Sequence, residues 1–191
     1  MLGDHHLFGK LGYFEQSYHI PLIVRMPGAN APRGVRVERF TESIDIAPTL
    51  ADWSGIPTPL QYDGRSLLPF LKGKQPGYWR DAAHWEFDFR DVTGGVPEAV
   101  LGLRLDQCQL AVRREERFKY VHFAGLPPLF FDLENDPDEL VNLSGNPDYA
   151  AEELAAARGM LSWRQAMCER TLNGIEVTAE GPVERSFAER F

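Results

Sequence analysis

The chain has 191 residues, of which 43% are hydrophobic and 12% aromatic, and its formal net charge at pH 7 is -8. This size and apolar content suit one domain, or one and a half, with a sizeable core. The acidity and the lack of a basic run argue against nucleic-acid binding, and no apolar run approaches the ~18 residues of a membrane span.

The N-terminal segment joins a polar loop to an apolar run. Lys10 lies between Gly9 and Gly12, where the backbone is least crowded, so the loop can present one cation at the edge of a strand. The apolar run Ile20–Val24 ends at Pro27-Gly28 and predicts a buried strand, as in a parallel sheet.

Residues 35–73 predict one more strand and two helices. The alternation in Val35–Phe40 indicates a short strand. Asp45 suits a helix N-cap, and Gly55 suits the end of the same helix. This helix would carry one apolar face at helical spacing: Ile46, Leu50 and Trp53. A short helix after the Asp63-Gly64 turn would bury four apolar side chains: Leu67, Leu68, Phe70 and Leu71.

The character of the sequence changes near residue 78. Short β-rich runs separated by turns predict an antiparallel sheet with strands at 82–89, 109–115, 118–123 and 129–133. A polar loop follows at 132–147, and Asp148 opens a helix predicted over about 149–172. We expect four apolar residues to form its buried stripe: Leu154, Met160, Leu161 and Met167. Residues 175–191 predict an irregular tail.

The cysteines and the N-terminus bear on chemistry and compartment. Cys108 and Cys168 form no CxxC or other metal spacing, so they are predicted to be reduced, partly buried thiols. Asp4, His5 and His6 stand where the apolar core of a secretory signal would lie. This favours a cytoplasmic location as an expectation and leaves the compartment otherwise open.

Several phrases occur in one order along the chain: GDHHLFGK, GYFE, ESIDIAPTL, DGRSLLPFL, RFKYVHF and FDLENDPDELVNL. Any one of them is weak evidence, but the ordered set resembles the C-terminal part of a sulfatase. The likeness is closest to the phosphonate monoester hydrolase branch of the alkaline phosphatase superfamily. It implies an α/β fold, namely the C-terminal part of an alkaline-phosphatase-like α/β sandwich plus a small antiparallel sheet with a packed C-terminal helix.

The resemblance also implies a division of the chain. Residues 1–77 would finish the large α/β domain, and residues 78–172 would form the C-terminal subdomain with the antiparallel sheet and its helix. Residues 173–191 would form a tail that contacts a neighbouring subunit, so the complete enzyme is expected to be a homo-oligomer. No nucleic-acid or membrane partner is expected.

Lys10 is the leading candidate for a catalytic and substrate-binding residue. Hydrolysis of a phosphate, phosphonate or sulfate ester builds negative charge on oxygen, which a fixed ammonium stabilises. By resemblance, Lys10 contacts the transferring group of a small anionic ester, with His6 near the substrate. Asp4 and His5 have the chemistry of metal ligands, but the family pattern places the metal on an earlier Asp-His pair. We therefore expect no metal ligand in this chain, with Asp4 and His5 supporting the loop at most.

The resemblance implies a divalent metal (Ca, Mn or Zn) and a formylglycine nucleophile in the complete enzyme. The nucleophile belongs to a C/S-x-P-x-R phrase, which neither Cys108 nor Cys168 nor any serine here fits. Two hypotheses stand. The chain is part of a metal-dependent hydrolase of sulfate, phosphonate or phosphodiester esters and is inactive alone, or it is a truncated or degenerate module that only folds or binds a partner.

Overall fold

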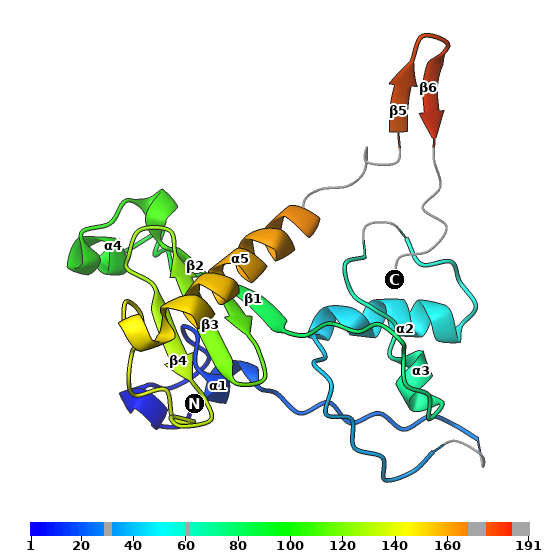
Figure 1. The fold of residues 1–191 in the computed structure, drawn as a ribbon, viewed down its shortest axis with the longest axis horizontal. Helices are drawn as coiled ribbons and strands as arrows, with labels where there is room; N and C mark the ends of the chain where they lie inside the picture. Colours follow the sequence, from blue (N-terminus) through cyan, green and yellow to red (C-terminus); the bar gives the residue numbers. More distant parts are fainter. Residues whose placement is uncertain (29–31, 60–61, 168–174, 185–191) are drawn as a thin grey trace. The chain divides into compact units, whose positions relative to one another are not determined.

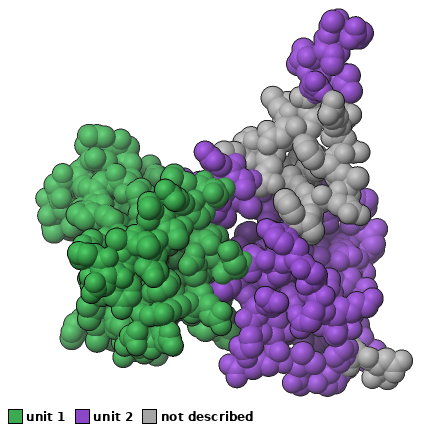
Figure 2. Space-filling model, viewed as in Figure 1, with its two compact units in different colours: residues 1–23, 81–162 green, residues 24–80, 163–191 purple. Residues whose placement is uncertain are grey.

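The computed structural model describes residues 1–28, 32–59, 62–167 and 175–184. They belong to two compact units, coloured separately in Figure 2. The first unit comprises residues 1–23 and 81–162, and the second comprises residues 24–80 and 163–191. The second segment of the first unit, which forms the sheet, thus begins at Asp81. This boundary lies close to residue 78, where the sequence becomes rich in short β-forming runs. The N-terminal 23 residues group with that sheet.

The first unit is built on a four-stranded antiparallel sheet in the order β1-β2-β3-β4 (Figure 1). Its strands are β1 (Ala83–Asp88), β2 (Gln109–Arg114), β3 (Phe118–Phe123) and β4 (Leu129–Asp132). Each strand pairs with its neighbour in sequence, as expected for runs separated by turns, so all four predicted strands are confirmed. The connection between β1 and β2 carries α4 (Val96–Leu101) and a 3-10 turn, η3 (Leu105–Gln107).

One face of this sheet, which we call the core face, contacts the N-terminal segment. Side chains alternate between the faces of a strand, and the register places Val112 opposite Val121 on the core face. The buried apolar cluster there consists of Leu110, Val112, Val121 and Phe131. The Tyr13 ring packs against it, with centroids 6.1 Å from those of Phe123 and Phe131.

Helix α5 (Ala150–Ala166) follows a 3-10 turn, η4 (Pro147–Tyr149), and runs across the sheet (Figure 1). Its buried residues are Ala156 and Met160. The prediction of Met160 is confirmed, but Leu154 and Leu161 are 50% and 64% exposed. Gly159 of the helix lies close to the Arg113 side chain of β2: a Cβ added at Gly159 would be only 2.6 Å from that side chain. The lack of a side chain at position 159 therefore leaves room for the Arg113 guanidinium.

The second unit contains two of the predicted helices. Helix α2 (Ile46–Trp53) follows a 3-10 turn, η2 (Ser43–Asp45), and helix α3 (Leu68–Leu71) follows in sequence. Gly55 has a φ of 70° just beyond α2, which confirms the predicted helix end. Asp45 precedes α2 as predicted, but its side chain does not cap this helix. Three of the four apolar residues expected around α3 are buried: Leu67, Leu68 and Phe70.

Two predicted strands are wrong. Neither Ile20–Val24 nor Val35–Phe40 has strand structure, and Ile23 is 93% exposed. A strand needs a hydrogen-bonded neighbour, and no described segment of this chain pairs with either run. The apolar face of α2 is also exposed, with its three residues between 45% and 54% accessible: Ile46, Leu50 and Trp53.

The described part of the tail is more regular than predicted. Strands β5 (Ile175–Thr178) and β6 (Gly181–Glu184) form an antiparallel hairpin. Cys168 lies outside the described residues, and the subunit contact expected of residues 173–191 stays a prediction. Cys108 is a free, fully buried cysteine. Among the described helices, none combines the length and apolar character that crossing a membrane requires.

Candidate functional site

The loop that leads to Lys10 is closed on itself by its backbone. The Gly9 N–H donates to the Met1 carbonyl at 3.1 Å, and the Gly3 N–H donates to the Leu7 carbonyl at 3.0 Å. Leu2 and Phe8 form an isolated antiparallel bridge. A 3-10 turn, η1 (Asp4–His6), forms the tip. Lys10 therefore directly follows a compact loop.

The side chain of Lys10 is exposed. The flanking glycines Gly9 and Gly12 have φ angles of 93° and 70°, a region that residues with a Cβ rarely adopt. Among the described residues, none pairs with the Lys10 ammonium. Its charge is thus available to an anion, and its catalytic role stays a prediction.

Asp4 and His5 make contacts inside the loop. The Asp4 carboxylate accepts the Leu2 N–H at 3.1 Å, and this hydrogen bond lowers the pKa of Asp4. The His5 ring stacks on Phe14 with a centroid separation of 3.8 Å. His6 is exposed, and it has a φ of 61°. The described residues include no group of three His, Cys, Asp or Glu side chains that could hold a metal ion, so Asp4 and His5 do not fit a metal site by themselves.

A buried ionic cluster fixes the segment that follows Lys10. The ammonium of Lys119, on β3, is fully buried and pairs with the carboxylates of Glu139 and Glu15, the latter at 3.1 Å. Glu139 also accepts the backbone N–H of Glu15 at 2.8 Å. Arg114 lies 3.4 Å from the second Glu15 oxygen. We call these four residues the Lys119 cluster; its two cations balance its two carboxylates.

Glu15 is the first residue of a short helix, α1 (Glu15–Tyr18), which aromatic contacts also hold. The Tyr18 ring stacks on Trp85 with centroids 4.9 Å apart. The Lys119 ammonium lies 5.3 Å from the Trp85 ring centroid, within cation–π range. Burial raises the pKa of both Tyr13 and Tyr18. The segment between Tyr13 and Tyr18 is therefore held by packing and by charge.

Sequence reasoning missed Lys119 and Glu139. The available signal was a lysine between Phe118 and Tyr120 inside a predicted strand, because a charged residue is rarely buried unless it is paired. Its partners Glu15 and Glu139 lie 104 and 20 residues away in sequence. No local pattern connects residues at such separations.

The second unit has its own buried ionic contact, centred on Asp45. This fully buried carboxylate accepts two hydrogen bonds from the Arg80 guanidinium, at 2.5 and 2.6 Å. It also accepts the backbone N–H groups of Glu42 at 2.8 Å and Arg65 at 2.7 Å. These bonds join the start of α2 to the chain on both sides of α3, which explains why Asp45 does not cap the helix.

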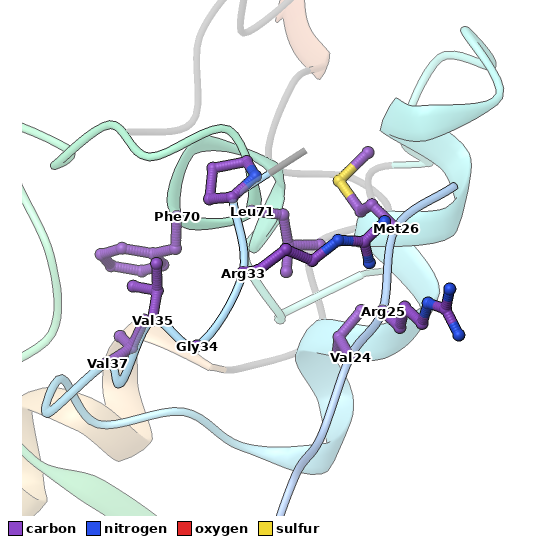
Figure 3. A pocket seen from close by; sticks show the side chains of 10 residues that line it. Val24, Arg25, Met26, Arg33, Gly34, Val35, Val37, Phe70 and Leu71 are labelled. Carbon is purple, nitrogen blue, oxygen red and sulfur yellow. The ribbon is translucent and has the colours of Figure 1, made fainter. Parts of the chain in front are cut away.

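The second unit also contains a pocket of 330 Å³, shown in Figure 3. Apolar side chains such as Val24, Phe70 and Leu71 line it together with Arg25 and Arg33. Arg33 reaches toward the interior of the group in Figure 3, while Arg25 points away from it. The described residues of the lining include no nucleophile and no general base, so they form no catalytic constellation of their own.

Comparisons with known proteins define the class of the chain. The family described as "N-sulphoglucosamine sulphohydrolase, C-terminal" matches residues 3–164. The multifunctional alkaline phosphatase superfamily protein PehA of Trinickia caryophylli is 49% identical over 97% of this chain and 36% of its own length. The chain thus spans about a third of this relative.

Two solved structures are similar over nearly the whole chain. The phosphonate monoester hydrolase of Agrobacterium radiobacter has a TM-score of 0.89 and 52% identity, covering 96% of this chain and 36% of its own. The phosphonate monoester hydrolase SpPMH of Silicibacter pomeroyi has a TM-score of 0.88 and 38% identity, with the same coverage. The chain belongs to the sulfatase family and corresponds to the C-terminal part of alkaline phosphatase superfamily proteins. The resemblance and the fold class inferred from the sequence are confirmed.

Proposed function

We propose that this chain forms the C-terminal part of a metal-dependent hydrolase of sulfate, phosphonate or phosphodiester esters. We expect phosphonate monoesters to be turned over fastest. The observation that carries this proposal is the similarity, over 96% of the chain, to the phosphonate monoester hydrolase of Agrobacterium radiobacter.

In this proposal, Lys10 supplies a fixed positive charge to the transferring group. Charge develops on the oxygens of the ester as the leaving bond lengthens, and a preorganised ammonium stabilises it. The exposed side chain on a closed loop, without a partner among the described residues, suits that role. His6 would lie at the edge of the same substrate.

The sequence resemblance implies a divalent metal, which would polarise the ester and the nucleophile. The described residues of this chain do not assemble its ligands, so we propose that the ligands and the formylglycine lie in the part of the relatives that this chain does not span. On this reading, the chain alone has no esterase activity.

The test is a fusion in which the N-terminal part of PehA is followed by residues 2–191 of this chain, with Leu2 at its aligned position. We expect it to hydrolyse 4-nitrophenyl phenylphosphonate faster than 4-nitrophenyl sulfate, while the chain alone hydrolyses neither. A folded, metal-loaded fusion without activity would instead support the alternative of a non-catalytic module.

Lys10→Ala in this fusion should lower kcat/KM by about 10²–10³-fold, the usual effect of removing one electrostatic stabiliser of the transition state. Thermal stability should change little, because the side chain is exposed. Lys72→Ala, at an exposed lysine just after α3, is a matched control and should retain activity. Unchanged kinetics in Lys10→Ala would remove the proposed role of Lys10.

A further inference from the structure

The loop that carries Lys10 is connected to the sheet through the residues that follow it. Within the loop, the backbone hydrogen bonds between Met1 and Gly9 are local. The Leu11 carbonyl, next to Lys10, accepts the hydroxyl of Ser17 at 3.3 Å, and Ser17 is buried in α1. Phe14, which precedes α1, stacks on His5. Contacts on both sides of Lys10 therefore lead to α1.

Helix α1 is in turn attached to the sheet by the Lys119 cluster. Glu15 uses its side chain to pair with Lys119 and Arg114, and its backbone N–H donates to Glu139. A helix of four residues cannot hold itself in place, because helix nucleation is unfavourable and its first N–H groups lack partners. The cluster supplies both a partner for the first N–H group and a fixed point on β3.

Glu139 adopts an uncommon backbone conformation to reach this cluster. Its φ is 57°, in the left-handed region, although it is not glycine. The Asp136 carboxylate holds the chain that follows, accepting the N–H groups of Leu140 at 3.1 Å and Val141 at 2.8 Å. Strained residues of this kind persist where the surrounding structure determines them, and an observed outlier is a reason to look for a role.

Stability alone does not account for a charged cluster at this position. Lys119 and Glu139 are fully buried and lose their hydration here, Glu15 and Arg114 lose most of theirs, and well-packed apolar residues of similar size often stabilise a protein as much or more. An ionic cluster does something that an apolar contact does not. It fixes position, because each charge must meet its particular partner in the low-dielectric interior.

We propose that Glu15, Lys119 and Glu139 are positioning residues that aim the Lys10 ammonium at the substrate anion. The sheet of the first unit thus serves catalysis from a distance, by holding α1 and through it the loop. This inference rests on the proposed function of Lys10. It adds residues that neither touch substrate nor ligate metal in that proposal.

The test is a double-mutant cycle in the PehA fusion with Lys10→Ala and Glu15→Gln. Glu15→Gln keeps the shape of the side chain, removes its charge and leaves Lys119 paired with Glu139, so the protein should fold. We expect Glu15→Gln alone to lower kcat/KM about 10–100-fold, since a misplacement of about 1 Å can cost that much. In the Lys10→Ala background, Glu15→Gln should change kcat/KM less than two-fold, because it acts through Lys10.

Hydrogen exchange of the peptides covering residues 2–14 gives a readout that does not depend on activity. Glu15→Gln should raise their exchange rates at least ten-fold. The matched control is Arg104→Gln, which breaks the exposed Arg104–Asp106 pair between β1 and β2, an ion pair that includes none of residues 1–18. It should leave both kcat/KM and the exchange of residues 2–14 within two-fold of the parent.

Three outcomes decide between the possibilities. Equal losses from Glu15→Gln with and without Lys10 would overturn the positioning role and leave only a structural one. Wild-type kinetics and exchange in Glu15→Gln would overturn the inference completely while the proposed function stands. An inactive parent fusion would overturn the proposed function, and the exchange of residues 2–14 would still decide whether the cluster holds the loop.

Discussion

The buried carboxylate of Asp132, at the end of β4, gives a sharp prediction for the stability of the first unit. Asp132 is 1% exposed and accepts hydrogen bonds from Arg117 at 2.7 and 3.1 Å. It also accepts the side-chain amide of Asn135 at 2.9 Å and the backbone N–H of Glu134 at 3.2 Å. The substitution Asp132→Asn keeps the shape of the side chain but removes the charge and one acceptor.

The expected cost follows from the number and kind of these bonds. Breaking a fully buried ion pair costs about 3–5 kcal/mol, but Arg117 is 47% exposed and recovers hydration when it loses its partner. The asparagine amide can also keep one of the accepted hydrogen bonds. A hydrogen bond to a charged group contributes about 1.5–3 kcal/mol, so we expect a net loss of about 2–3 kcal/mol. This loss corresponds to a factor of about 30–150 in the opening equilibrium.

Native-state hydrogen exchange of the PehA fusion measures this loss locally, in peptides that cover residues 117–135. Their slowest amides should exchange about 30–150-fold faster in Asp132→Asn. Asp138→Asn makes the same charge change at an exposed position of the same loop and should have little effect. A change below three-fold in Asp132→Asn would refute the reasoning that the Arg117–Asp132 pair stabilises the sheet.

Three further predictions address other parts of the chain. The Arg117 guanidinium holds the pKa of Asp132 far below its usual range. This carboxylate should therefore contribute stability that is present above about pH 4 and is lost as the pH falls toward its folded-state pKa. Hydrogen exchange of residues 117–135 at pH 3 and pH 6 should reveal this loss of stability, and Asp132→Asn should abolish the pH dependence. Gly64→Ala should destabilise the second unit by more than about 2 kcal/mol, because its Cβ would lie 2.0 Å from the Ile44 carbonyl oxygen; thermal unfolding of the fusion would detect this, with Gly77→Ala, where a Cβ meets open space, as the control. The chain alone should bind a hydrophobic dye and aggregate, since Ile23, Trp53 and other apolar side chains are exposed; a monomer with a sharp thermal transition and no dye binding would contradict this.

The antiparallel sheet could be predicted from the sequence because each strand pairs with its neighbour in sequence, and short turns connect β2 to β3 and β3 to β4. Local pattern and pairing partner then lie within one stretch of chain. The prediction of a strand at Ile20–Val24 was wrong for the opposite reason. Its apolar composition is that of a strand, but strand formation also depends on a neighbour, and the described residues provide none. Composition alone could not reveal this.

The predicted buried stripe of α5 was partly wrong because it depends on how the helix packs against the sheet. Helical periodicity correctly placed Met160 on the buried side, but hydrophobicity favoured Leu154 over Ala156. Gly159 lies so close to the Arg113 side chain of β2 that an added Cβ would be 2.6 Å from it, and the buried residues of the helix are Ala156 and Met160. Such a distance is a tertiary property, set by both surfaces together, and no single segment encodes it.

For the candidate site, sequence motifs were sufficient to select Lys10 and the glycines around it, because these lie within four consecutive positions. The groups that hold the loop are dispersed over α1, β2, β3 and the turn after β4, and only folding brings them together. Each half of the arrangement alone is unremarkable: a glutamate after a loop, and a lysine inside a strand. Because the ammonium of Lys119 is fully buried, however, it must have carboxylate partners, and Glu15 provides one of them from the segment next to Lys10. The cost of burying that charge therefore ties the position of the N-terminal segment to the sheet more strictly than apolar packing of Tyr13 would do alone.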